Sequence, residues 1–140
     1  KNIYSLGPIL SFIIYVGLEL ITSNKSYVVV NIPTSISNIK RRGQDPISKM
    51  VEQACYLNKS KYRYKKNLIR NFQNRIDQVG LDYQERKLNL ANSFKVSKSE
   101  KRPILVVDDL ITTGVSLSES IKALEAKGNK VEGCVVIASN

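Results

Sequence analysis

The sequence predicts an α/β fold in which a mostly parallel β-sheet is flanked by helices. Apolar, β-branched runs typical of buried strands alternate with segments whose apolar residues recur every three or four positions, as in helices. Such alternation favours parallel strands joined by right-handed crossovers. A chain of 140 residues can bury its own core, so we expect one domain over residues 1–140.

The first expected element is a helix from about Leu6 to Ile21, within a packing segment 1–25. The run from Ile3 to Ile21 approaches the ~20 residues that a spanning helix needs, but Pro8 and Glu19 interrupt it. We therefore expect a core-packing helix without stable membrane insertion, with a membrane-associated protein as the less favoured alternative. The expected inward stripe is Leu10, Ile13, Ile14, Gly17, Leu18 and Ile21.

The first core strand is expected over Tyr27 to Ile32, where Pro33 ends it. Asp45-Pro46 predicts the start of a helix, with Asp45 as N-cap and an end near Asn58. A weaker strand is expected over Asn67 to Phe72, followed by a long polar segment over residues 73–94 whose length between core elements indicates a functional segment.

The strongest strand signal is ILVVDD, from Ile104 to Asp109, and LITTG is expected to turn after it. An amphipathic helix should run from Ser116 to Lys127, with Gly128 as its C′ residue. A last strand is expected over Val131 to Ala138. In such sheets, ligands bind beyond the carboxyl ends of the strands. Three of the predicted loops lie at these ends: 33–44, 73–89 and 108–116.

Two adjacent acids, Asp108 and Asp109, close the strongest strand. Strands disfavour aspartate and like charges repel, whereas a pair of carboxylates suits two neighbouring sugar hydroxyls. The following residues, Thr112, Thr113, Gly114, Val115 and Ser116, combine hydroxyl groups with a helix N-terminus, which predicts a site for one phosphate group. The alternative is that Thr113 or Ser116 only caps the helix.

The segment from Ile104 to Ser116 resembles the phosphoribosyl pyrophosphate signature of type I phosphoribosyltransferases. Two further regions resemble motifs of the ComF family. The first is Asn31-Ile-Pro-Thr followed by Lys40-Arg41-Arg42-Gly43. The second is Arg75-x-x-Gln78-x-Gly80-Leu81 followed by Glu85-Arg86-x-x-Asn89 and Phe94. The chain departs from that family at Gln44-Asp45-Pro46, and it lacks the Cys-rich zinc module that many members carry. Either the protein has no such module or the numbering starts after it.

The resemblance implies a role for each matched residue. Asp108 and Asp109 would hold the ribose hydroxyls, and residues 112–116 would hold the 5′-phosphate. The resemblance also implies that the segment 73–94 forms a lid over the ligand. The residues expected to face the pyrophosphate or to lie on this lid are Lys40, Arg41, Arg42, Arg75, Gln78 and Arg86. Mg²⁺ would be bound through the ligand's pyrophosphate and water, so no protein metal site is expected.

The function implied is a phosphoribosyltransferase-like protein that binds phosphoribosyl pyrophosphate with Mg²⁺ and transfers the phosphoribosyl group to an unidentified acceptor. The chain has no histidine, and we identify no catalytic general base. The alternative is a non-catalytic competence factor that binds single-stranded DNA or the uptake machinery. An oligomer is compatible with either.

Charge and cysteines set further expectations. The formal net charge is +10, and residues 37–102 contain 17 basic against 6 acidic residues, which indicates an anionic partner or a solvated basic face. The stretch 59–70 mixes six basic residues with Tyr62 and Tyr64, a composition that single strands favour. Cys55 and Cys134 are interpreted as reduced, buried thiols of a cytoplasmic protein.

Overall fold

The computed structural model describes residues 6–33, 45–71 and 93–139. Within them, a four-stranded parallel sheet has the strand order β2-β1-β5-β6. Its strands are β1 (Tyr27–Asn31), β2 (Tyr62–Tyr64), β5 (Ile104–Ile111) and β6 (Val131–Ser139). The predicted α/β class with a mostly parallel sheet is confirmed.

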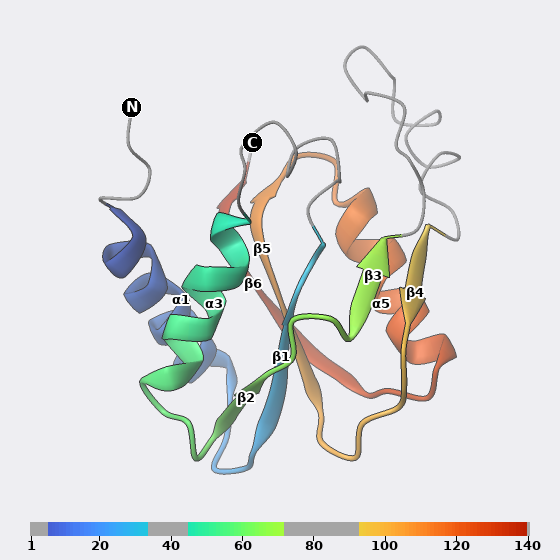
Figure 1. Cartoon of the computed structure of the whole chain (residues 1–140), viewed down its shortest axis with the longest axis horizontal. Coiled ribbons are helices and arrows are strands. Elements are labelled where there is room, and N and C mark those ends of the chain that lie inside the picture. Colours follow the sequence, from blue (N-terminus) through green and yellow to red (C-terminus); the bar gives the residue numbers. More distant parts are fainter. Residues whose placement is uncertain (1–5, 34–44, 72–92, 140) are drawn as a thin grey trace.

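Helices cover both faces of this sheet (Figure 1). Helices α1 (Gly7–Ile21) and α3 (Pro46–Tyr56) pack on one face, where one core cluster gathers around Val29, Leu105 and Val107. Helix α5 (Val115–Ala126) lies on the other face with a second cluster around Val30 and Val106. Because successive strand residues alternate between faces, each of the two central strands supplies both cores.

A small antiparallel sheet, β3 (Ile69–Asn71) with β4 (Phe94–Val96), lies beside α5. The predicted strand 67–72 is confirmed in shortened form as β3. The sequence did not predict β2 or β4, since each is only three residues long with a basic residue at its centre. The prediction of a single domain with a lid over residues 73–94 stays a prediction, because most of that segment lies outside the described residues.

The predicted helix ends match the local chemistry. Asp45 is the N-cap of α3 and Pro46 its first residue. At the C-terminal end of α5, Gly128 has φ +84°. The N–H group of Gly128 donates to the carbonyl of Glu125, and that of Asn129 donates to the carbonyl of Leu124. This is the left-handed helix ending that glycine permits.

Helix α1 packs through only part of its predicted stripe. Ile14 and Leu18 are fully buried, whereas Ile13 and Ile21 are 47% and 43% exposed. The stripe over Ile13 and Ile21 was therefore predicted wrongly, because this helix is apolar on every side and its periodicity does not identify the inner face. A Cβ atom at Gly17 would lie 2.8 Å from Val135 Cγ1, so glycine permits the close approach of α1 to β6.

Among the described residues, no helix has the length and apolar character that crossing a membrane requires.

Candidate functional site

The carboxyl end of β5 carries both predicted acids. Asp108 is half-buried and Asp109 is exposed, and the backbone N–H of Asp109 donates to Asp108 Oδ1 at 3.0 Å. The strand continues through Ile111, so the turn expected from Leu110 starts only at Thr112. Because neighbouring strand residues point to opposite faces, a ligand that contacts both carboxylates has to lie across the end of β5.

Helix α5 begins directly after this strand end. Its N-cap is Gly114, at φ +71°, so neither Thr113 nor Ser116 is the capping residue. Glycine provides no capping side chain, and the intrahelical bonds start with Ser118 N–H donating to the Gly114 carbonyl at 2.9 Å. The N-cap residue of α5 therefore has no side chain that could accept a hydrogen bond from the first-turn N–H groups. These N–H groups form the positive end of the helix dipole.

The five predicted phosphate-binding residues differ in what they present. Thr112 and Thr113 are exposed and Ser116 is half-buried, so their hydroxyl groups lie at or near the surface. Val115 is only 5% exposed and anchors the start of α5 in the core. A Cβ atom at Gly114 would meet nothing within 4 Å, so this position needs glycine for its backbone angle and not for space. Backbone N–H groups and hydroxyls together can bind one phosphate group.

The end of β1 lies next to this point on the sheet. Asn31 is in register with Val107, and Ile32 N–H donates to the Val107 carbonyl at 3.0 Å. The chain that leaves β1 at Pro33 therefore starts beside the acids of β5. The predicted pyrophosphate and lid residues, Lys40, Arg41, Arg42, Arg75, Gln78 and Arg86, lie outside the described residues.

A buried polar cluster under this edge was not predicted. Asn31 is 3% exposed, and its side-chain oxygen accepts hydrogen bonds from the hydroxyls of Tyr64, at 2.7 Å, and Ser48, at 3.5 Å. Burial raises the pKa of Tyr64 to about 12, so the phenol stays protonated and donates. The signal that could have revealed this cluster is a single asparagine at the end of an otherwise apolar strand.

The cluster connects to the start of α3. The single hydroxyl proton of Ser48 is shared between Asn31 and the Asp45 carboxylate, which is the nearer acceptor and also accepts from the backbone N–H of Ser48 at 3.5 Å. Strand β1, strand β2 and helix α3 are thus held together at the carboxyl edge of the sheet by hydrogen bonds among their own side chains.

The described residues contain no group of three or more His, Cys, Asp or Glu side chains that could hold a metal ion. A pair of acids at one strand end fits a cation that is bound mainly by its ligand's phosphates. Cys55 is buried, as predicted, but Cys134 is exposed on the edge strand β6. The buried assignment of Cys134 was wrong because an edge strand leaves one flank uncovered.

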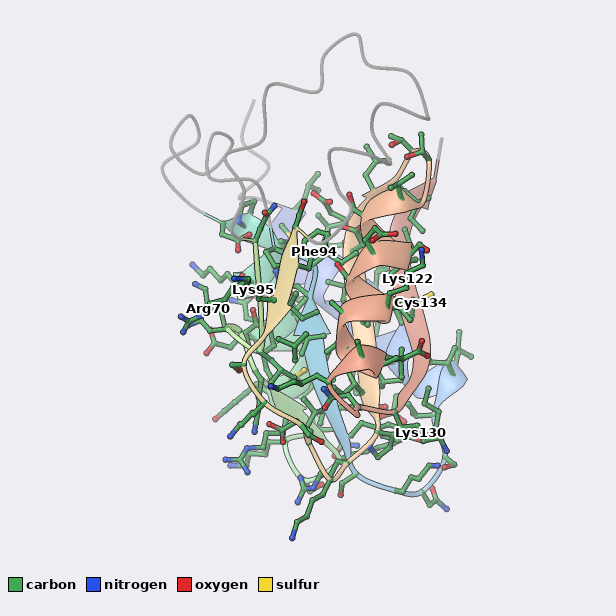
Figure 2. The ribbon with its side chains drawn as sticks, turned by 90° about the vertical axis from the view of Figure 1, so that its right-hand side faces the viewer. Arg70, Phe94, Lys95, Lys122, Lys130 and Cys134 are labelled. Carbon is green, nitrogen blue, oxygen red and sulfur yellow. The ribbon has the colours of Figure 1, made fainter. Side chains whose placement is uncertain are left out.

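The tyrosines of the basic stretch do not form a stacking surface. Tyr62 is 2% exposed and shares a hydrogen bond with Thr22, and Tyr64 packs against the core. The one basic residue between them, Arg63, is exposed. Arg70, at the end of the stretch, and Lys95 stand opposite each other on β3 and β4 and extend away from α5 (Figure 2).

A cleft of about 340 Å³ lies between β4 and the later turns of α5. It is lined by Phe94, Val96, Lys122 and Lys127, among others. The α5 part of this lining begins at Glu119, more than one helical turn after Gly114.

No family model matches the sequence. Competence protein F of Haemophilus influenzae is 39% identical over 66 residues, which are 44% of this chain and 29% of that protein. The orotate phosphoribosyltransferase of Campylobacter lari is 42% identical over 52 residues, covering 37% of this chain and 25% of the enzyme. That of Campylobacter hominis is 40% identical over 55 residues, covering 39% and 26%.

Each sequence match therefore spans less than a third of the relative's length. A crystal structure of a hypoxanthine phosphoribosyltransferase from Staphylococcus aureus aligns over 94% of this chain and 61% of that chain, with 11% identity and a TM-score of 0.46. The predicted resemblance is confirmed as weak homology, over part of the chain, to Competence protein F and to phosphoribosyltransferases.

Proposed function

We propose that this protein is phosphoribosyltransferase-like, binding phosphoribosyl pyrophosphate with Mg²⁺ at the carboxyl edge of the parallel sheet and transferring the phosphoribosyl group to an acceptor. The observation that carries the proposal is the β5–α5 junction. Asp108 and Asp109 lie near the carboxyl end of β5, and a helix N-terminus without a side-chain cap follows at Gly114. The weak homology to orotate phosphoribosyltransferases supports the same ligand class.

The ligand's parts match the groups along this junction. The carboxylates of Asp108 and Asp109 accept hydrogen bonds from the ribose hydroxyls, while the first-turn N–H groups of α5 and the hydroxyls of residues 112–116 bind the 5′-phosphate. The six basic or amide residues at 40–42, 75, 78 and 86 are proposed to face the pyrophosphate. Mg²⁺ neutralises part of the pyrophosphate charge when bound.

The proposed reaction is a displacement at the anomeric carbon. The bond to the pyrophosphate oxygen breaks and a bond from a nucleophilic nitrogen of the acceptor forms. Positive charge that develops on the ribose ring is favoured by the nearby carboxylates of Asp108 and Asp109. Basic side chains that face the pyrophosphate stabilise the charge of the leaving group.

Calorimetric titration of phosphoribosyl pyrophosphate, with and without Mg²⁺, tests the proposal. We expect Mg²⁺-dependent binding that weakens at least about 100-fold when both acids become amides, Asp108→Asn with Asp109→Asn, because two charged acceptors of ribose hydrogen bonds are lost. The matched control, Glu52→Gln with Glu125→Gln, changes the net charge equally at two exposed positions. Equal affinity of the two double variants would refute the site.

A competence factor that binds single-stranded DNA is the second candidate. The homology to Competence protein F and the exposed, opposed pair Arg70 and Lys95 favour it. If phosphoribosyl pyrophosphate does not bind, filter binding of single-stranded DNA at several salt concentrations decides this case. Phosphate contacts require affinity to fall steeply with salt, so salt-independent binding would contradict it.

A further inference from the structure

Hydrogen bonds connect the residue at which the chain leaves β1 with the residue at which it enters α3. Asn31 is the last residue of β1, and Asp45 is the N-cap of α3. The hydroxyl of Ser48, in the first turn of α3, lies between them, 3.5 Å from Asn31 Oδ1 and closer still to the Asp45 carboxylate. We call Asn31, Asp45 and Ser48 the edge clamp, because they join a strand end and a helix start at the carboxyl edge of the sheet.

The edge clamp fixes the direction in which the chain leaves β1. The side-chain amide of Asn31 donates to the carbonyl of Ile32 at 3.2 Å, while the N–H of Ile32 donates to the Val107 carbonyl of β5 at 3.0 Å. The side-chain oxygen of Asn31 accepts from the hydroxyl of Tyr64 on β2 at 2.7 Å, which holds the amide in this orientation. Ile32 is therefore held through both its N–H and its carbonyl, directly before Pro33.

Packing alone does not require polar residues at this place. Asn31 and Ser48 are each only 3% exposed, and the same face of the sheet is lined by aliphatic residues such as Val29 and Val107. An aliphatic residue at position 31 could be buried without the cost of removing an amide from water. Hydrogen bonds have directions that apolar contacts lack, so the edge clamp specifies one arrangement of the strand end and the helix start.

The edge clamp holds both ends of a segment that carries part of the proposed function. In the sequence, the basic residues 40–42 lie between Asn31 and Asp45. We propose that the edge clamp positions these three basic residues for the leaving pyrophosphate, an inference that rests on the proposed function. Fixed ends leave the intervening chain fewer conformations to lose when a ligand binds, which favours affinity. The clamped end of β1 also lies beside the end of β5 that carries Asp108, next to the proposed ribose site.

Calorimetric titration of the two halves of the ligand tests this positioning role. For the wild-type protein with Mg²⁺, we expect binding of inorganic pyrophosphate and of ribose 5-phosphate as separate ligands. Ser48→Ala removes the hydroxyl that links the strand end to the helix start. Its affinity for pyrophosphate should fall about 10-fold, because the basic residues are no longer preorganised. Its affinity for ribose 5-phosphate should change less than about twofold, whereas a general structural defect would lower both affinities.

A matched control lies on the other side of the sheet. Ser120 of α5 is fully buried, and its hydroxyl has no hydrogen-bond partner in the described part of the chain. Ser120→Ala therefore removes a buried serine hydroxyl without breaking a link, and it should leave both affinities unchanged. Tyr64→Phe keeps the ring but removes the donor to Asn31, so it should also weaken pyrophosphate binding alone, and it carries the test if Ser48→Ala does not fold. Circular dichroism verifies the fold of each variant.

The outcomes separate this inference from the proposed function. If the wild-type protein binds both halves, the inference alone is overturned when the Ser48 and Tyr64 variants weaken both halves equally, or weaken pyrophosphate no more than Ser120→Ala does. Binding of ribose 5-phosphate without binding of pyrophosphate would likewise overturn the positioning role alone. A wild-type protein that binds neither half would overturn the proposed function, and the role of the edge clamp with it.

Discussion

Two strand–helix units, β1–α3 and β5–α5, meet at the same edge of the sheet, but only the helix of the first has a side-chain cap at its N-terminus. In β1–α3, Asp45 caps the helix and the buried Asn31 joins Ser48 and Tyr64 in hydrogen bonds. In β5–α5, the strand ends in more exposed acids and the helix starts at Gly114 without a side-chain cap. The first unit satisfies its polar groups internally, whereas the helix of the second unit has no side-chain cap on its first-turn N–H groups. Under the proposed function, a similar topology would serve stability in one unit and ligand binding in the other.

The largest expected effect concerns the β1–α3 unit: its buried Cys55 in α3 should lower the free energy of unfolding at alkaline pH. Burial raises the pKa of Cys55 from 9.0 to about 12. Between these values the unfolded chain releases the thiol proton while the native chain retains it, so stability falls as pH rises, by about 1.4 kcal/mol per pH unit. Urea unfolding between pH 8 and 11 should show this slope reduced in Cys55→Ala. The control Cys134→Ala removes an exposed thiol, and an equal reduction there would contradict the assignment.

The second effect concerns the uncapped helix. Ser116→Asp places a carboxylate in the first turn of α5, where it occupies the positive helix end and repels a bound phosphate. We expect affinity for phosphoribosyl pyrophosphate to fall about 100-fold in calorimetry, with no loss of thermal stability. Ser118→Asp carries the same charge two residues further into the helix, at an exposed position, and should weaken binding much less. Equal losses would mean that the effect is one of general repulsion.

The smallest effect concerns the capped helix. Asp45→Ala removes the N-cap of α3 and one partner of Ser48, and it should lower the free energy of unfolding by about 1–2 kcal/mol in urea titrations. Glu52→Ala, at an exposed position of the same helix, is the matched control. If both variants unfolded at the same urea concentration as the wild type, the cap would not be a structural element.

The sequence predicted those elements whose signals are local. The apolar runs of β1 and β5, the Asp45-Pro46 start of α3 and the glycine after α5 each act within a few residues, so they could be identified without tertiary information. Strand β2 depends instead on pairing with β1, and β4 on pairing with β3. A strand of three residues is too short to show a periodicity from which it could be inferred.

The candidate site was predictable to the same extent. The acids at 108 and 109 and the glycine at 114 stand in a short contiguous segment, so their meeting at one strand end followed from the sequence order. The polar cluster of Asn31, Ser48 and Tyr64 joins three elements, and only the strand order shows that they meet. Likewise, an all-round apolar helix such as α1 requires the packed structure to reveal which side stays exposed.

The close contact of α1 with β6 has a consequence for biosynthesis. Lys25, just after α1, pairs with Glu132 on β6 across 107 positions of the chain, and Gly17 lies against Val135. During translation, α1 leaves the ribosome long before its docking strand exists, with apolar residues on both its inner and outer sides. Until β6 emerges, the helix exposes apolar surface that can aggregate. A chain truncated before β6 would expose this surface permanently, so we expect its soluble yield to be low.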